Sequence, residues 1–303
     1  MMRFLFLIFG LSLSSFATPA CNALELDQNL PTKNFKHTRN SILSMLADYH
    51  HTASDTLTVV NSQALVEVKF SYGALRKDLF DEDIELWIDT CSNSLTKLGI
   101  FRTDSDGRIK VALDTKTLQL SGAFKIWARV TGDNSFTTLI LRVMTPGTEL
   151  VVFDIDGTLT YSNTDSSVRP GAVNTTHAIR DSGFEVLYLS GRHYVLTNIT
   201  KRLLRDNQFA PGTLVVGQSI SDIWPSNGHV GEFKLKYLNY LRSLGIKIKQ
   251  AYGNAESDIY AYLSAKIPTQ NIYIMGEYGG QKDTQALGED FLSHLGLLVA
   301  VRD

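Results

Sequence analysis

The pattern of apolar segments changes at Thr145-Pro146-Gly147. Beyond this point short apolar runs alternate with helical stretches, which predicts a mostly parallel, doubly wound sheet with helices packed on it. The expected strands are residues 150–153, 184–189, 213–216, 246–252 and 272–275. The expected helices are residues 172–182, 194–206, 233–244 and 256–265. We therefore predict an α/β domain over residues 147–303.

The part of the chain before Pro146 has a different pattern, in which short alternating segments rich in Val, Ile, Phe and Thr are separated by turn sequences. These segments are residues 57–60, 64–70, 84–89, 98–103, 109–113, 124–130 and 137–143. About seven such strands predict an all-β sandwich domain, to which we assign residues 55–146. Residues 21–54 are expected to form a linker with a short helix at 41–49. A chain of 303 residues has room for both domains.

Residues 1–20 have the pattern of a cleaved secretory signal, with one positive charge at Arg3, an apolar run and small residues before Cys21. The run is shorter than the roughly 20 residues that cross a bilayer, so no transmembrane segment is expected in the mature chain. We therefore expect a secreted or periplasmic protein, with lipoprotein anchoring through Cys21 as the weaker alternative. The other cysteine is Cys91, and a disulfide and two separate thiols are both open.

The formal net charge of the chain is −2, and loss of Arg3 with the signal would make it about −3. Proteins that bind nucleic acid are usually basic, so no nucleic-acid partner is expected. An anionic substrate would have to be attracted by local positive charge and by a metal ion.

The segment Asp154-Ile155-Asp156-Gly157-Thr158 directly follows the first strand of the α/β domain, at the edge where such sheets bind ligands. Two carboxylates one residue apart can take different roles in the hydrolysis of a phosphate ester. Asp154 would attack phosphorus, and Asp156 would give a proton to the leaving oxygen and later take one from water. Gly157 allows a sharp turn whose N–H groups can hold phosphate. An ordinary surface turn is the competing interpretation.

Three further residues follow in a fixed order. Ser190, at the end of the next strand, could donate a hydrogen bond to a phosphoryl oxygen, and Lys234, at the start of a helix, could offset negative charge. Asp258, after Gly253-Asn254, could supply a second carboxylate for Mg²⁺. Each residue also has an ordinary structural explanation. Ser190 could cap a helix, Lys234 could be a solvated surface lysine, and Asp258 could be an acid favoured at a helix N-terminus.

Together, the order Asp-x-Asp-Gly-Thr, Ser-Gly-Arg, Lys and Gly-Asn-x-x-x-Asp resembles the haloacid dehalogenase (HAD) superfamily of phosphotransferases. The resemblance implies a HAD-like fold with Asp154 as nucleophile and Asp156 as acid and base. It implies phosphate contacts and metal ligands as well. The phosphate contacts would be Thr158, Ser190, Gly191 and Lys234. The Mg²⁺ ligands would be Asp154, Asp258 and the backbone of Asp156. The short spacing between motifs leaves little room for a cap domain.

Residues 154–160, 232–234 and 253–262 resemble the lipins, which are Mg²⁺-dependent phosphatidate phosphatases. Residues 169–173 and 291–296 resemble more closely the C-terminal domain of phosphatidylinositol transfer proteins of the retinal degeneration B type. That domain recognises phosphatidic acid and lacks the catalytic aspartate, whereas this chain has both aspartates. We therefore expect a monomeric phosphatidate phosphatase that releases diacylglycerol and phosphate at a membrane surface. The alternatives are a phosphatidic-acid-binding module without turnover and a phosphatase of soluble phosphate esters or phosphoproteins.

Overall fold

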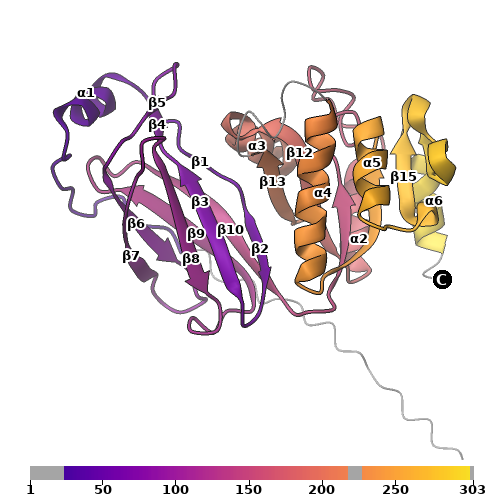
Figure 1. The fold of residues 1–303 in the computed structure, drawn as a ribbon, viewed down its shortest axis with the longest axis horizontal. Coiled ribbons are helices and arrows are strands. Elements are labelled where there is room, and N and C mark those ends of the chain that lie inside the picture. Colours follow the sequence, from indigo (N-terminus) through magenta and orange to yellow (C-terminus); the bar gives the residue numbers. More distant parts are fainter. Residues whose placement is uncertain (1–23, 218–226, 301–303) are drawn as a thin grey trace, which may run out of the picture.

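The structure, a computed structural model, describes residues 24–217 and 227–300. Figure 1 shows two domains side by side, a β-sandwich formed by the earlier part of the chain and a sheet flanked by helices formed by the later part. The prediction of a sandwich followed by a parallel-sheet domain is confirmed. The predicted signal at residues 1–20 and Cys21 lie outside the described residues.

The sandwich consists of a five-stranded sheet in the order β2-β10-β9-β6-β7, a three-stranded sheet in the order β1-β3-β8, and a hairpin of β4 and β5. Alternate residues of these strands point inward, as Ile109, Val111 and Leu113 do in β8, and their side chains form one apolar core. The strands are β1 Thr52–Ala53, β2 Thr56–Val59, β3 Gln63–Lys69, β4 Ser71–Tyr72, β5 Lys77–Asp78, β6 Asp83–Ile88, β7 Thr96–Arg102, β8 Arg108–Asp114, β9 Gly122–Val130 and β10 Phe136–Met144.

The helix before the sandwich, α1 Thr38–Leu46, begins and ends three residues earlier than predicted. It ends because the next residues pair with strand β4. Ala47 has an extended backbone, Tyr49 forms a bridge with Tyr72, and the N–H of His50 donates to the carbonyl of Ser71 at 2.8 Å. Pairing with a distant strand, which the local sequence does not reveal, therefore sets this boundary.

The second domain is built on a six-stranded parallel sheet in the order β13-β12-β11-β14-β15-β16. The strands are β11 Glu149–Phe153, β12 Glu185–His193, β13 Thr213–Gly217, β14 Lys247–Gly253, β15 Ile272–Met275 and β16 Gln285–Gly288. The helices are α2 Ala172–Asp181, α3 Thr197–Asp206, α4 Asn227–Ser243, α5 Glu256–Ser264 and α6 Leu292–Ala300. Side chains of α4 and α5 pack into the apolar core on one face of the sheet, and those of α2 and α3 into the core on the other.

Two elements at the end of the chain are not among those predicted. Strand β16 has only Leu287 buried, so it lacks the apolar run that would predict a strand. Helix α6 follows it and packs against α2. Within the described residues, the structure contains no helix that is both long and apolar enough to cross a membrane.

The sandwich contacts the parallel-sheet domain beside β13 and α3. Asp55 and Leu214 exchange two hydrogen bonds, of 3.0 Å from the Asp55 N–H and 2.9 Å to its carboxylate. The ammonium of Lys201, on α3, lies 3.1 Å from the same carboxylate and donates to the carbonyl of Ala53 at 2.9 Å. Leu57 belongs to the apolar core of the parallel-sheet domain. Polar and apolar contacts therefore fix the position of the sandwich.

Candidate active site

The ends of three neighbouring strands bring the predicted residues to one edge of the sheet. Asp154 follows β11, Ser190 lies in β12 and Gly253 ends β14, and these strands are adjacent in the order β12-β11-β14. Because all three strands are parallel, their carboxyl ends meet at the same edge. The sheet topology therefore brings together motifs that are far apart in the sequence.

A buried lysine lies between two buried carboxylates at the centre of this edge. The Nζ atom of Lys234, on α4, is 2.5 Å from Oδ1 of Asp154 and 2.5 Å from Oδ1 of Asp258. All three side chains are almost completely shielded from solvent. Buried charges are stable only when they are paired and hydrogen-bonded. The charge of each of these three buried side chains is therefore stabilised by the other two.

This arrangement changes the acidity of the nucleophile candidate. Burial raises the pKa of Asp154 to about 7, a shift that the charge of Asp258 increases and the charge of Lys234 opposes. Burial lowers the pKa of Lys234, but the two carboxylates raise it more, so this pKa lies above its ordinary value. Lys234 is therefore a permanent cation. Asp154 titrates near neutral pH.

Asp258 caps the start of α5 and also faces the lysine between the two acids, while its role as a Mg²⁺ ligand stays a prediction. Its Oδ2 accepts hydrogen bonds from the N–H groups of Asn254 at 3.0 Å and Ala255 at 3.2 Å, which fixes the start of α5. Its Oδ1 faces Lys234. The contact with the helix N-terminus thus orients the carboxylate toward the site.

Thr158 connects Asp154 to the fourth motif. Its Oγ1 is 3.2 Å from Oδ2 of Asp154 and 3.2 Å from Oδ1 of Asn254, and one hydroxyl hydrogen serves one of these acceptors at a time. The N–H of Asp154 donates to the carbonyl of Tyr252 at 2.9 Å. Backbone and side-chain contacts together hold the turn after β11.

Gly157 is required at this turn by both conformation and space. Its φ is +80°, and a Cβ atom added there would lie 2.0 Å from Nδ2 of Asn254. We expect Gly157→Ala to lower the free energy of unfolding by about 3 kcal/mol in urea titrations, because strain and a clash add. Gly147→Ala is the matched control, since φ there is +91° and the space is open. It should cost only about 1 kcal/mol, and equal losses would contradict the steric argument.

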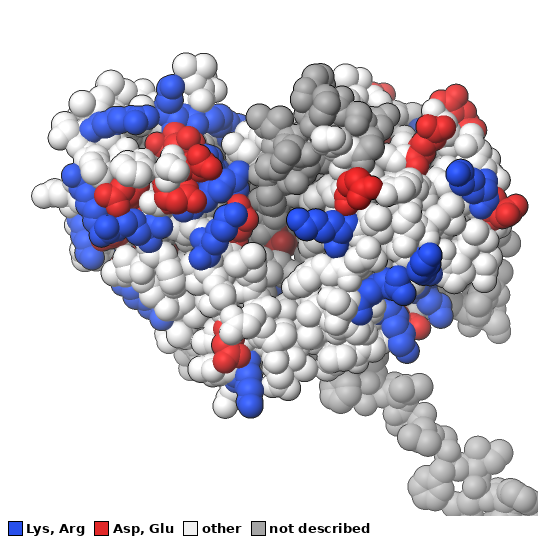
Figure 2. Space-filling model, in the orientation of Figure 1, with Lys and Arg blue, Asp and Glu red and all other residues white. Residues whose placement is uncertain are grey.

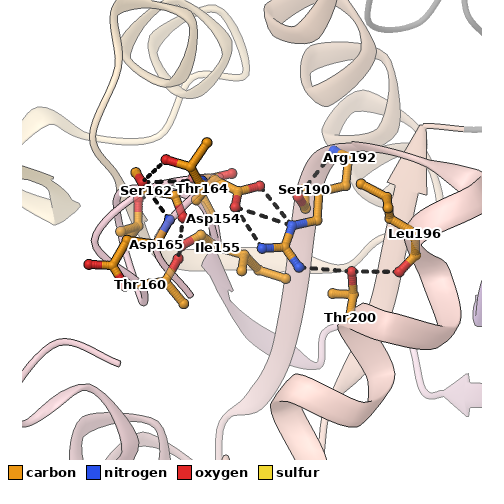
Figure 3. A network of polar contacts seen from close by, with 12 residues as sticks. Asp154, Ile155, Thr160, Ser162, Thr164, Asp165, Ser190, Arg192, Leu196 and Thr200 are labelled. Carbon is orange, nitrogen blue, oxygen red and sulfur yellow. Dashed lines mark hydrogen bonds and ion pairs between the residues drawn. The ribbon is translucent and has the colours of Figure 1, made fainter. Parts of the chain in front are cut away.

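Asp156 pairs with Arg192, at the end of β12. Nε of Arg192 is 2.9 Å from Oδ2 of Asp156, and Nη2 is 2.7 Å from Oδ1. On its other side Arg192 donates to Thr200 at 3.0 Å, and Figure 3 shows this arginine reaching between the turn after β11 and helix α3. Sequence reasoning assigned no role to Arg192. The sequence signal that could have identified Arg192 was its position directly after Ser190 and Gly191, at the same edge of the sheet.

Ser190 and Gly191 lie beside this ion pair. Ser190 is fully buried, and its Oγ accepts a hydrogen bond from the N–H of Arg192 at 3.2 Å. A Cβ atom on Gly191 would lie 2.7 Å from a methyl group of Val230, in the first turns of α4. Close packing of that helix therefore explains the glycine. Phosphate contacts by either residue stay a prediction.

The donor set suits a magnesium ion held by two carboxylates rather than three. The portion of the chain that the structure describes has no group of three or more His, Cys, Asp or Glu side chains placed to share a metal ion. The carboxylates of Asp154 and Asp258 converge on one cation, Lys234, while that of Asp156 is occupied by Arg192. Mg²⁺ commonly binds through one or two carboxylates and keeps several waters. Binding of Mg²⁺ by Asp154, by Asp258 and by the backbone of Asp156 stays a prediction.

A depression of about 450 Å³ adjoins the ion pair. Asp156 and Arg192 contribute to its wall, together with residues of α3 and of the loop before α2. The wall also includes the apolar side chains of Leu196 and Ile199 and the basic side chain of Arg202. The acidic residue Asp206 lines the same wall, so the depression presents charges of both signs and apolar surface next to Asp156.

Two residues outside the four motifs support the turn. Nε of Arg169 donates to the carbonyl of Gly157 at 3.2 Å, and its Nη1 donates to the carbonyl of Glu289 at 2.6 Å. In α6, His294 lies 2.8 Å from the hydroxyl of Tyr252, the residue whose carbonyl accepts from Asp154. The last part of the chain therefore braces the site.

Known families match both domains. Residues 151–276 match the family model described as "PITM 1-3, LNS2 domain", and residues 49–143 match "PITM 1-3, beta-sandwich domain". The chain is thus similar to the PITM 1-3 proteins in both of its domains. The part that matches the LNS2 model contains the aspartate cluster. This finding supports the resemblance to lipins and retinal degeneration B-type proteins at the level of the family.

Curated relatives extend the match over most of the chain. "Protein retinal degeneration B" of Drosophila melanogaster is 28% identical over 281 residues, which cover 89% of this chain and 22% of the relative. The human "Membrane-associated phosphatidylinositol transfer protein 3" is 27% identical over 283 residues, covering 89% of this chain and 28% of the relative. The chain thus spans less than a third of these relatives.

The comparison corrects the predicted location. A secreted or periplasmic protein was expected from residues 1–20, but the relatives that align with 89% of the chain are by name membrane-associated transfer proteins, not secreted ones. The charge and apolar run at residues 1–20 were therefore misleading as a sign of secretion.

Proposed function

We propose that this chain is a Mg²⁺-dependent phosphatase that hydrolyses phosphatidic acid through an aspartyl-phosphate on Asp154. The observation that carries the proposal is the buried cluster in which Lys234 contacts both Asp154 and Asp258 at 2.5 Å. Stability alone does not require two buried carboxylates with one lysine at a strand end, whereas phosphoryl transfer uses such a concentration of charge. The relatives are named for a phospholipid, phosphatidylinositol, which favours a phospholipid substrate.

The proposed reaction has two displacements. An Asp154 carboxylate oxygen bonds to phosphorus while the bond from phosphorus to the diacylglycerol oxygen breaks, and Asp156 gives its proton to that oxygen. Asp156 then takes a proton from water as the water oxygen attacks phosphorus and releases Asp154. Because Arg192 donates to both carboxylate oxygens of Asp156, Asp156 must leave this contact and take up a proton from solvent before it can protonate the leaving oxygen.

The metal would be held by the carboxylates of Asp154 and Asp258. Mg²⁺ bound there would neutralise charge on the phosphate oxygens. Lys234 keeps the two acids close together and favours the ionised form of Asp154, because its positive charge lowers the pKa of that residue. Thr158 orients the second oxygen of Asp154.

A module that binds phosphatidic acid without turnover is the second candidate. The two-point contact between Arg192 and Asp156 favours it, because this contact occupies both of the carboxylate oxygens that catalysis would need. The names of the relatives, which are transfer proteins, favour it as well.

Phosphate release separates the two candidates. Purified protein is incubated with phosphatidic acid in mixed micelles, with Mg²⁺ or with EDTA, and free phosphate is measured over time. We expect Mg²⁺-dependent release that is absent with EDTA. Binding of the lipid without release would support the binding module. Rapid release from p-nitrophenyl phosphate and phosphopeptides, but not from the lipid, would support a soluble substrate.

A further inference from the structure

The end of the sandwich that carries α1 exposes large apolar side chains. In the described part of the chain, the three most exposed large hydrophobic residues are Leu75 at 81%, Leu46 at 80% and Met45 at 79%. Ile42, one turn earlier in α1, is 50% exposed. Single exposed apolar residues are ordinary, but a cluster of them is typical of an interaction surface.

These side chains belong to one continuous surface. The end of α1 packs against the turn between β4 and β5, where the N–H of Gly73 donates to the carbonyl of Asp48 at 2.8 Å. Met45, Leu46, Gly73 and Ala74 line one shallow depression, and Leu75 follows Ala74 directly. We name Ile42, Met45, Leu46 and Leu75 the apolar tip.

The charges beside the apolar tip include three basic side chains. Arg39 of α1 and Lys77 of β5 are exposed and Arg76 is half-buried, while the exposed acids nearby are Asp48 and Asp106. The neighbouring Asp78 is paired with Lys69. Figure 2 shows Lys and Arg side chains forming a band across the upper part of the sandwich, with acidic side chains among them. Exposed apolar groups surrounded by cations match an anionic lipid surface.

The apolar tip lies at the same end of the molecule as the candidate active site. Strand β12 ends at His193, and the ring of the next residue, Tyr194, packs against the guanidinium of Arg108 at 4.8 Å. The side chain of Asn198, in α3, donates to the carbonyl of His51, close after α1 in the sequence, at 2.9 Å. In Figure 1, α1 and the β4–β5 hairpin stand at the top of the sandwich, and α3 stands at the top of its neighbour.

We propose that the apolar tip inserts into the headgroup region of an anionic phospholipid bilayer and so brings the candidate active site to the membrane surface. The fixed contacts between Asp55, Leu214 and Lys201 would then set the orientation of the site. The choice of phosphatidic acid as the lipid rests on the proposed function. Insertion of the apolar tip does not, because it depends on apolar and basic side chains outside the active site.

Vesicle sedimentation tests the proposal. The Met45→Asp and Leu46→Asp double variant is mixed with phosphatidylcholine vesicles that contain phosphatidic acid, and the bound fraction is measured by pelleting. We expect binding to fall about tenfold or more, because two apolar groups are lost and negative charge is added. The matched control is Leu65→Asp with Ile100→Asp, two apolar residues exposed to 57% and 44% on strands β3 and β7. The control should bind like the unchanged protein.

Hydrolysis of p-nitrophenyl phosphate and thermal unfolding are measured on the same samples and should be unchanged in the double variant. Equal binding by the double variant and the unchanged protein would overturn the proposal. Equal losses in the double variant and in the control would overturn it too. Tip-dependent binding without any phosphate release would leave membrane docking standing while the proposed function fails.

Discussion

Asp154→Asn is expected to lower the rate of phosphate release from phosphatidic acid by at least about 10³-fold at saturating substrate. The asparagine side chain has nearly the same shape but no carboxylate to attack phosphorus. Lys234 keeps Asp258 as a partner at 2.5 Å, so the fold should persist. The rate constant is measured from phosphate release in mixed micelles with Mg²⁺. Loss of less than tenfold would exclude Asp154 as the nucleophile.

The covalent step has its own readout. Protein quenched with acid during turnover should carry one phosphoryl group on the peptide that contains Asp154, detected by mass spectrometry. Asp156→Asn should make this signal appear more slowly, because the first displacement needs Asp156 to protonate the leaving oxygen. Asp165→Asn is a matched control, since Asp165 is an exposed acid of the nearby loop that contacts Ser167. It should leave both rate and labelling unchanged.

Most of the second domain could be predicted from the sequence because each central strand is an apolar run. In β11, Leu150 and Val152 pack into one core while Val151 and Phe153 pack into the other, so nearly every position is apolar. Strand β16, at the sheet edge, buries only Leu287 and gave no such signal. The end of α1 was missed because hydrogen bonds to β4, far along the chain, determine it.

The order of the motifs in the sequence suggested the members of the candidate site and a lysine that offsets the charge of its carboxylates. That this one lysine contacts both Asp154 and Asp258 depends on how α4 lies over the sheet. The sequence placed the side chain of Asp156 at the same reaction centre. The structure instead directs it to Arg192, 36 residues away, a pairing that local spacing cannot show.

Lys234→Met is expected to lower kcat/KM at pH 7 by about tenfold or more and to shift its pH dependence. Without Mg²⁺ the pKa of Asp154 is about 7, so protons should compete with Mg²⁺ for this carboxylate, and activity at limiting Mg²⁺ should fall as pH decreases through 7. The positive charge of Lys234 lowers this pKa. Its removal should therefore move the acid limb of the pH profile to higher pH.

Lys236→Met is the matched control, because Lys236 lies on the same helix but is exposed. It should leave the pH profile unchanged, and Lys234→Arg should keep the acid limb closer to that of the unchanged protein than Lys234→Met does.

Urea titration of the unchanged protein at several pH values gives an independent test of the raised pKa of Asp154. Because the folded-state pKa of Asp154 is raised, the folded protein binds more protons than the unfolded chain between about pH 4 and pH 7. This residue's contribution to stability is therefore full below that window and decreases as pH rises through it. An acid limb that stays in place in Lys234→Met would show that Lys234 does not control the ionisation of Asp154.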